Sequence, residues 1–212
     1  MGDRQPSAPL VRIVDDDAGV RNALALLVRA GGFRVDSYPS AEAFLGDYDP
    51  DRPGCLVLDV RMPGMTGLQL QAFLHERDDP LPVIMVSGQG DIPMAVEAIR
   101  AGALDFIEKP LQIGKLLPLV QRAIALDAEL RAERARRSAA ADRLSRLTPR
   151  EREVLRGLVD GKLNKVIAAE LGISTRTVEL HHFHIMHKLG ARSLSDLVRM
   201  VLTAEHSSQV AP

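Results

Sequence analysis

Cysteine, aromatic residues and long apolar runs are all scarce in this chain of 212 residues. Its one cysteine, Cys55, excludes an intrachain disulfide and, because it lies in an apolar segment, favours a reducing compartment. No apolar run is long enough to span a bilayer, and Met1 to Pro9 lack the apolar core of a signal peptide. We therefore expect a soluble, cytoplasmic protein.

Net charge is small as well, at -1 with a sequence pI near 6.6. This balance gives no overall attraction to nucleic acid or membranes, although a basic patch can be offset by an acidic one elsewhere. Hydrophobic residues make up 46% of the chain, which is ample for a packed core and argues against global disorder. The length suits one large domain or two small ones.

The segment from Cys55 to Gly67 is the most informative stretch. Four apolar residues run into Asp59, and a Pro63-Gly64 turn follows. A continuous apolar run closed by turn residues is typical of a strand buried on both faces of a parallel sheet. An Asp at the carboxyl end of such a strand stands where open α/β sheets place their ligand sites, although an isolated Asp there also serves as a loop cap.

Strands alternate with helices through the first half of the chain. The strands are expected at 10–14, 33–38, 55–59, 82–86 and 105–107. Helices are expected at 18–30, after the N-cap Ser40, at 67–75 and after the N-cap Asp91. This order predicts βαβ units in a doubly wound, five-stranded parallel sheet of flavodoxin-like architecture, with helices on both faces.

The pattern becomes helical from Ile113. An apolar stripe runs to Leu130, and Arg131 to Arg143 are rich in the strong helix formers Ala, Arg and Glu. The segment fits either a solvated helical linker or a parallel coiled-coil dimer.

A second group of helices begins with Thr148 to Glu151, a capping box with Pro at the first helical position. Helices at 164–171 and 175–189, joined by a Gly-containing turn with Ser174 as N-cap, form a helix-turn-helix pattern, for which a plain helical bundle is the alternative. Another helix follows Ser193. Basic side chains on or beside this pattern that can contact phosphates are Lys162, Lys165, Arg176, Lys188 and Arg192. The expected boundaries are 10–125 for the first domain, 126–146 for the linker and 147–205 for the second domain.

The ends of the first and third strands are neighbours in a doubly wound sheet, so Asp15, Asp16 and Asp59 should lie within a few ångströms. Three carboxylates this close raise each other's pKa unless a cation lies among them, and oxygen-only ligands of high charge suit Mg²⁺. Lys109 and Ser87, at neighbouring strand ends, add a positive charge and a hydroxyl. Together these groups predict a phosphoryl-acceptor site.

The motifs around these residues resemble the receiver domain of two-component response regulators. They are Val14 to Asp17, Leu58 to Gly67, Ser87-Gly88 and Phe106 to Pro110, and the segments 90–96 and 101–106 resemble the FixJ subgroup of the FixJ/NarL type. The resemblance implies that Asp59 accepts phosphate from a sensor histidine kinase. It implies that Asp16, Asp59 and the carbonyl of Arg61 bind Mg²⁺, with Asp15 acting through water. Ser87 would contact the phosphoryl oxygen, and Phe106 would change rotamer on activation unless it is a core residue only.

The second half resembles the LuxR-type DNA-binding domain through Leu147 to Leu155, Asn164-Lys165, Leu171 to Ser174 and Thr177 to Glu179. The resemblance implies that the helix from Thr175 enters the major groove of promoter DNA. Arg176, Thr177, Glu179, His182 and Phe183 are expected on its exposed face, with Val178, Ile185 and Leu189 inward. The full set of expected DNA contacts is Lys165, Ser174, Thr175, Arg176, Thr177, Glu179, His182, Phe183 and Lys188. Relatives often carry a basic residue where this chain has Glu179 or Phe183, and Glu179 can accept from a cytosine amine.

Four histidines between 181 and 187 share helix faces, but no Cys or carboxylate completes a metal site. The leading hypothesis is therefore a phosphorylation-switched transcription regulator, an activator and not an enzyme. It would dimerise on phosphorylation and work with RNA polymerase. Two alternatives remain open: a Mg²⁺-dependent phosphatase with an Asp nucleophile, whose motif is broken at Gly19, and a DNA-binding protein that needs no phosphorylation.

Overall fold

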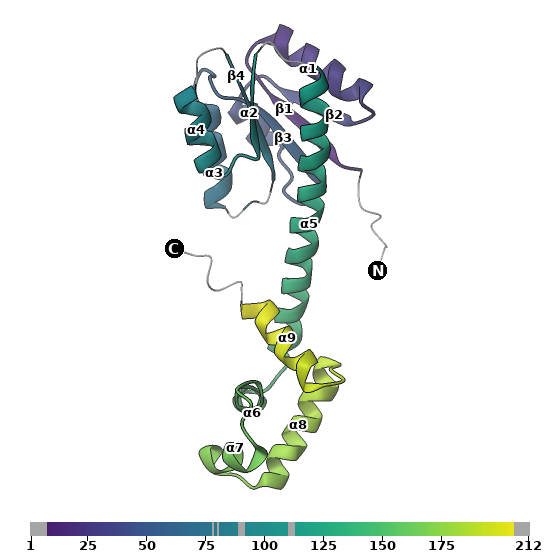
Figure 1. Ribbon diagram of the computed structural model, residues 1–212, viewed down its shortest axis with the longest axis vertical. Helices are drawn as coiled ribbons and strands as arrows, with labels where there is room; N and C mark the ends of the chain where they lie inside the picture. Colours follow the sequence, from purple (N-terminus) through teal and green to yellow (C-terminus); the bar gives the residue numbers. More distant parts are fainter. Residues whose placement is uncertain (1–7, 78, 80, 89–91, 110–112, 206–212) are drawn as a thin grey trace. The chain divides into compact units, whose positions relative to one another are not determined.

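The computed structural model describes residues 8–77, 79, 81–88, 92–109 and 113–205 (Figure 1). These residues form two compact units, the first ending at Arg131 and the second beginning at Ala132. Asp91, the expected N-cap, and Pro110, the expected strand-closing residue, lie outside the described residues. The expected boundaries near 125 and 146 stay a prediction.

The first unit is built on a five-stranded parallel sheet of order β2-β1-β3-β4-β5. Its strands are β1 (Leu10–Val14), β2 (Arg34–Tyr38), β3 (Gly54–Asp59), β4 (Val83–Ser87) and β5 (Asp105–Glu108). β1 pairs with both β2 and β3, so the direction of winding reverses between β1 and β3. The carboxyl ends of these two strands therefore flank the crevice where such sheets bind ligands, as expected.

Helices cover both faces of the sheet (Figure 1). They are α1 (Ala18–Ala30), α2 (Ala41–Asp47), α3 (Gly67–Glu76), α4 (Ile92–Arg100) and α5 (Ile113–Ser145). Cys55 and Val57 of β3 pack with α1 and α5, whereas Leu56 and Leu58 pack with α2, α3 and α4. Burial on both faces explains why β3 is a continuous apolar run.

Helix α5 begins on the first unit and continues into the second. Leu116, Val120 and Ala123 are fully buried against the sheet, at the spacing of one helix face. The helix continues to Ser145 with mostly exposed side chains, which confirms that the expected linker is helical. Whether two copies of it pair stays a prediction.

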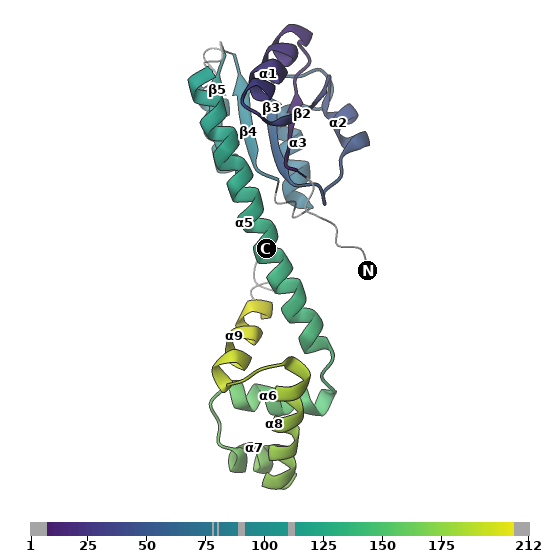
Figure 2. The same cartoon turned by 90° about the vertical axis from the view of Figure 1, so that its right-hand side faces the viewer.

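The second unit contains α6 (Pro149–Val159), α7 (Asn164–Leu171), α8 (Thr175–Leu189) and α9 (Leu194–Glu205). α6 and α7 both pack against α8 (Figure 2). Each of the four helices contributes at least one fully buried residue to the core, among them Val154, Ile167, Val178 and Leu197. The expected capping box is present, because Thr148 and Glu151 each accept a backbone N–H from the other.

Candidate functional sites

Three carboxylates meet at the carboxyl ends of β1 and β3. Asp59 is the last residue of β3 and Asp15 follows β1, and both side chains are buried, whereas Asp16 is exposed. One oxygen from each of the three lies within 4.8 Å of the others. The structure therefore brings together the acidic set that the sequence predicts.

Local backbone contacts hold these carboxylates in place. Asp17 caps α1 by accepting from the amides of Gly19 and Val20, and its own amide donates to Asp15 Oδ1 over 2.9 Å. On the other strand, a Cβ at Gly67 would overlap with the carbonyl oxygen of Asp59. Only glycine lets α3 begin this close to the end of β3.

Lys109, directly after β5, supplies the positive charge. Its Nζ lies 2.7 Å from Asp59 Oδ1 and 2.8 Å from Asp15 Oδ2. Burial raises the pKa of Asp59, and Asp15 and Asp16 raise it further, while Lys109 opposes both effects. Burial acts to lower the pKa of Lys109, but its two carboxylate partners outweigh this and raise it. The lysine therefore stays charged and offsets part of the acidic cluster.

Ser87 and Phe106 occupy the next two strands. Ser87 ends β4, is 1% exposed, and follows the residue that pairs with Asp59. Phe106 lies in β5 opposite Met85 and is half-buried against the cluster beneath α2, α3 and α4. This position is compatible with a core role and with a rotamer change. The Arg61 side chain is exposed in the loop after β3.

The donor set fits a hard divalent cation. Asp15, Asp16 and Asp59 offer only oxygen, and the exposed side of Asp16 leaves a path for water and ions. Among the described residues this is the one group of three or more acidic, His or Cys side chains placed to hold a metal. The histidines of α8 form no such group.

The second unit carries the expected helix-turn-helix. Gly172 ends α7 in the left-handed conformation, with φ of 65°, and lets the chain turn directly into α8. Ser174 caps α8, and its Oγ accepts from the Thr177 amide and lies 2.8 Å from Thr177 Oγ1. The two hydroxyls are thus engaged with each other at the helix start.

The outward face of α8 differs in part from the expected one. Arg176, Glu179 and Phe183 are exposed as expected, but Thr177 and His182 are half-buried. Leu180 and His184, which the sequence pattern did not place on this face, are exposed. As expected, Val178, Ile185 and Leu189 are buried.

Two of the lysines expected to contact DNA form ion pairs within the second unit. Lys188 Nζ donates to the buried Glu151 over 2.7 Å, and Lys162 pairs with Glu170 at the same distance. Lys165, near the start of α7, and Thr175, the first residue of α8, are exposed. A DNA contact by Lys188 stays a prediction that its pairing with Glu151 does not favour.

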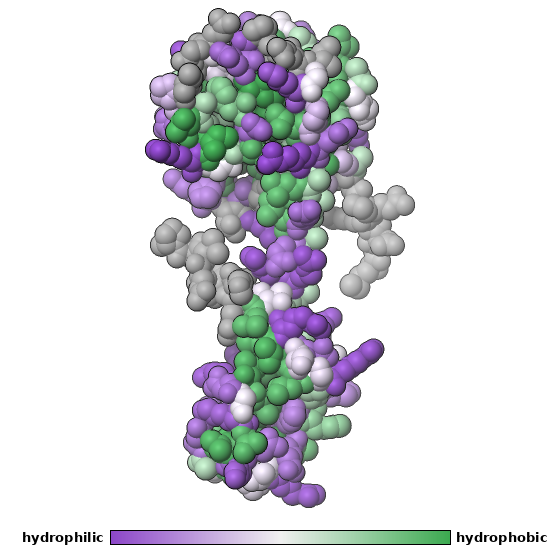
Figure 3. All heavy atoms as spheres, in the orientation of Figure 1, coloured by the Kyte–Doolittle hydropathy of each residue, from purple (hydrophilic) through white to green (hydrophobic). Residues whose placement is uncertain are grey.

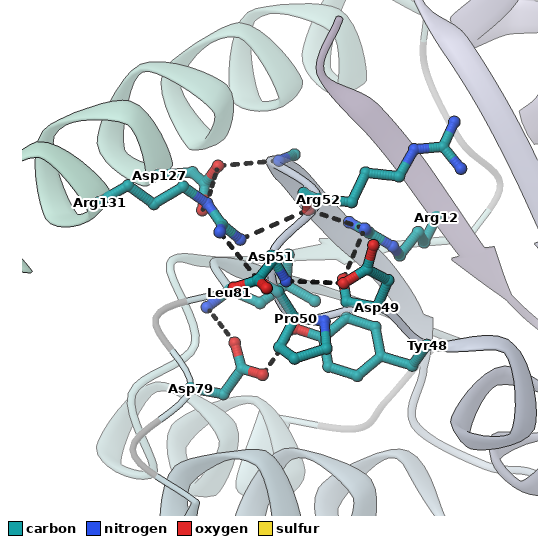
Figure 4. Close-up of polar contacts among 11 residues, drawn as sticks. Arg12, Tyr48, Asp49, Pro50, Asp51, Arg52, Asp79, Leu81, Asp127 and Arg131 are labelled. Atoms are coloured by element: carbon teal, nitrogen blue, oxygen red, sulfur yellow. Dashed lines mark hydrogen bonds and ion pairs between the residues drawn. The ribbon is translucent and has the colours of Figure 1, made fainter. Parts of the chain in front are cut away.

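A polar network that the sequence pattern did not predict lies at the opposite end of the sheet (Figure 4). Asp127 of α5 is 1% exposed and accepts from the Gly54 amide and from Arg131 Nε. Arg131 in turn donates to the Pro50 carbonyl, and Arg12 of β1 donates to the Arg52 carbonyl. The spacing of Asp127 and Arg131, four residues apart on α5, was the one sequence feature that indicated an ion pair here. The network fastens the end of α5's packed half to the loop before β3.

No helix among the described residues has the length and apolarity needed to cross a bilayer.

Two comparisons agree with this architecture. Residues 11–121 match the family described as response regulator receiver domain, and residues 145–201 match bacterial regulatory proteins of the luxR family. The chain is 44% identical over 199 residues to the transcriptional regulatory protein FixJ of Azorhizobium caulinodans, covering 94% of each chain. It is 44% identical over 200 residues to the response regulator protein TodT of Pseudomonas putida, covering 94% of this chain and 87% of the other.

Solved structures also match almost the whole chain. The response regulator StyR matches with a TM-score of 0.81 at 43% identity, covering 92% of this chain and 99% of that one. Full-length FixJ from B. japonicum matches with a TM-score of 0.56 at 38% identity, covering 95% and 99%. This chain therefore belongs to the two-component response regulators of the FixJ type, with a receiver domain followed by a LuxR-type DNA-binding domain.

Proposed function

We propose that Asp59 accepts a phosphoryl group from a histidine kinase and that the phosphorylated protein binds promoter DNA through α8. The observation that carries the proposal is the position of the Lys109 ammonium, 2.7 Å from Asp59 and 2.8 Å from Asp15. A buried carboxylate with a lysine beside it and two further carboxylates at a sheet's switch point is suited to phosphoryl transfer.

In the proposed reaction, an Asp59 carboxylate oxygen attacks the phosphorus of a phosphohistidine. A P–O bond forms, the P–N bond breaks, and the imidazole leaves. Lys109 offsets negative charge on the transferring group, and the Ser87 hydroxyl donates to one of its oxygens. Mg²⁺ held by Asp16, Asp59 and the Arg61 carbonyl, with Asp15 through water, would neutralise further charge.

Ser87 and Phe106 would transmit the effect of phosphorylation to the surface of the receiver domain. Movement of Ser87 towards the phosphoryl group vacates space that the Phe106 ring can fill, and this changes the surface formed by α4 and β5. We place a second receiver on that surface, because a dimer sets two recognition helices about one turn of DNA apart. The dimer would then recruit RNA polymerase at a promoter, as an activator in the cytoplasm.

The test is phosphorylation by a small phosphodonor with Mg²⁺, read by intact mass. Wild type should gain the mass of one phosphoryl group, and Asp59→Asn should gain none while keeping its circular dichroism spectrum. Asp51→Asn, which alters an exposed carboxylate in the loop before β3, is the matched control and should behave as wild type. A phosphoryl group on the Asp59→Asn protein, mapped to another residue, would overturn the assignment. Continuous release of inorganic phosphate at enzymatic rates would favour the phosphatase alternative.

A further inference from the structure

Two large apolar side chains stand exposed on the outward face of α8. Leu180 is 54% exposed and Phe183 is 66% exposed. They are three residues apart, so they are neighbours on the helix surface. Apolar residues reach the surface elsewhere in the second unit (Figure 3), but this pair lies on the helix that the proposed function places in the major groove.

The surroundings of the pair favour an anionic partner. Arg176 is exposed in the first turn of α8, and the one carboxylate of this helix is Glu179. Lys188 lies on the same helix, but its charge is paired with Glu151. The exposed Lys165 stands on the preceding helix, α7. The exposed cations Arg176 and Lys165 favour an anionic partner, and the apolar pair favours a partner that also presents apolar groups. Duplex DNA meets both conditions, because the C5-methyl groups of thymine project into its major groove.

We propose that Phe183 and Leu180 read thymine by packing against its C5-methyl group, Phe183 at one position of the site and Leu180 at a neighbouring one. The proposal rests on the proposed DNA-binding function and adds the base that the helix selects. The Phe183 ring lies beside that of the next residue, His184, with ring centroids 6.0 Å apart at a tilt of 58°. Glu179, on the same face, can accept from a cytosine amine, so the two kinds of contact would read different bases.

The experiment isolates the methyl group. The phosphorylated full-length protein first selects its preferred duplex from random sequence. Each thymine of that duplex is then replaced by deoxyuridine, which lacks only the C5-methyl group, and binding is measured at constant salt. Losing one buried methyl contact should weaken binding about fourfold at each position that is read. In a second pair of duplexes, the same thymine is replaced by cytosine or by 5-methylcytosine. The duplex with 5-methylcytosine should bind more tightly than the one with cytosine, because it restores the methyl group.

Variants of Phe183 and Leu180 show which side chain contacts which thymine methyl group. Phe183→Ala should bind the thymine and deoxyuridine duplexes equally at one position, and Leu180→Ala should do so at a neighbouring position. Both side chains are exposed, so the fold should survive, and Phe183→Leu provides an apolar variant that keeps part of the discrimination. Leu26→Ala, which removes a 71% exposed side chain from α1, is the matched control and should keep the full discrimination.

The outcomes separate this inference from the proposed function. If wild type binds a selected sequence but tolerates deoxyuridine at every position, the thymine contact is wrong while DNA binding stands. The thymine contact is also wrong if Phe183→Ala alters self-association and leaves the deoxyuridine effect unchanged, because the pair would then face protein. If no sequence is selected at all, the proposed DNA-binding function itself fails.

Discussion

Two buried carboxylates, Asp59 and Glu151, each have a lysine within 2.7 Å, yet their pKa values move in opposite directions. Burial and two neighbouring carboxylates raise the pKa of Asp59 more than Lys109 lowers it. Burial also acts to raise the pKa of Glu151, but hydrogen bonds from Lys188 and from the Thr148 amide and hydroxyl lower it to about 2. The direction of each pKa shift depends on how many hydrogen-bond donors and how many other carboxylates lie near the group. Asp59 keeps an acidic neighbourhood suited to a cation, whereas one oxygen of Glu151 accepts three hydrogen bonds that stabilise the ionised form.

At the residue scale, Glu151 should make the free energy of unfolding of the second unit depend on pH in the acid range. Its native pKa lies below the ordinary value of 4.5, so its contribution is present above pH 4.5 and is lost as the pH falls through about 2. Replacing it by Gln should cost about 1.5–3 kcal/mol at neutral pH, because hydrogen bonds to a charged group are lost. Denaturant unfolding followed by circular dichroism between pH 2 and pH 7 measures both effects.

Glu153→Gln is the matched control, since it removes a more exposed carboxylate from the same helix. A wild-type free energy of unfolding that falls no more steeply below pH 4.5 than that of Glu151→Gln would contradict the proposed role of Glu151.

At the scale of elements, α5 is fastened by Asp127. This carboxylate accepts from the Gly54 amide over 2.8 Å and from Arg131, whose guanidinium also reaches the Pro50 carbonyl. Asp127→Ala should lower the free energy of unfolding of the first unit by about 1.5–3 kcal/mol and speed hydrogen exchange at Gly54 and along the end of the packed half of α5. Asp127→Asn keeps an acceptor for Gly54 and should show a smaller effect.

Glu133→Ala provides the control, because Glu133 pairs with Arg136 and Arg137, one turn away on α5, and such surface pairs contribute little to stability. Unchanged exchange at Gly54 in Asp127→Ala would show that the loop is held by other contacts.

Substitutions in the two helices of the helix-turn-helix should affect DNA binding differently. Glu179, exposed on α8, should take part in base selection, so Glu179→Ala should change the preferred sequence at a cost of about 1–3 kcal/mol of discrimination. Lys165, exposed on α7, should contact a phosphate, so Lys165→Ala should weaken all sequences alike and lower the salt slope by about one. Selection from random DNA and a salt titration measure the two, and an unaltered preferred sequence in Glu179→Ala would refute the base contact.

Element boundaries follow closely from local signals. Ser40, Thr148 and Ser174 are predictable as N-caps because their hydroxyls accept backbone amides in a fixed local pattern, and each does so in the structure. Asp127 is not predictable in this way, because its acceptor role depends on Gly54, which is 73 residues away. The exposure of Leu180 is not predictable either, because an apolar residue on an amphipathic helix is ordinarily assigned to the core. The meeting of Asp15 with Asp59 is predictable only once the strand order is assumed.

At the scale of the whole molecule, phosphorylation can shift the protein between states only by its differential stabilisation of one of them. Such couplings are typically 1–3 kcal/mol, which corresponds to about 5–150-fold in affinity. We expect a mainly monomeric protein that dimerises with the phosphodonor present, as sedimentation velocity would show. An identical dimer in both conditions would mean that the α5 linkers pair permanently and that the switch is reorientation.

The most direct measurement is the affinity for a selected inverted-repeat duplex, with and without the phosphodonor, for wild type and Asp59→Asn. A phosphorylation switch at Asp59 predicts that wild type binds about 5–150-fold more tightly once phosphorylated. It also predicts that Asp59→Asn binds with the weaker affinity in both conditions. Equal affinities for phosphorylated and unphosphorylated wild type, with the phosphoryl group on Asp59 verified by mass, would contradict it.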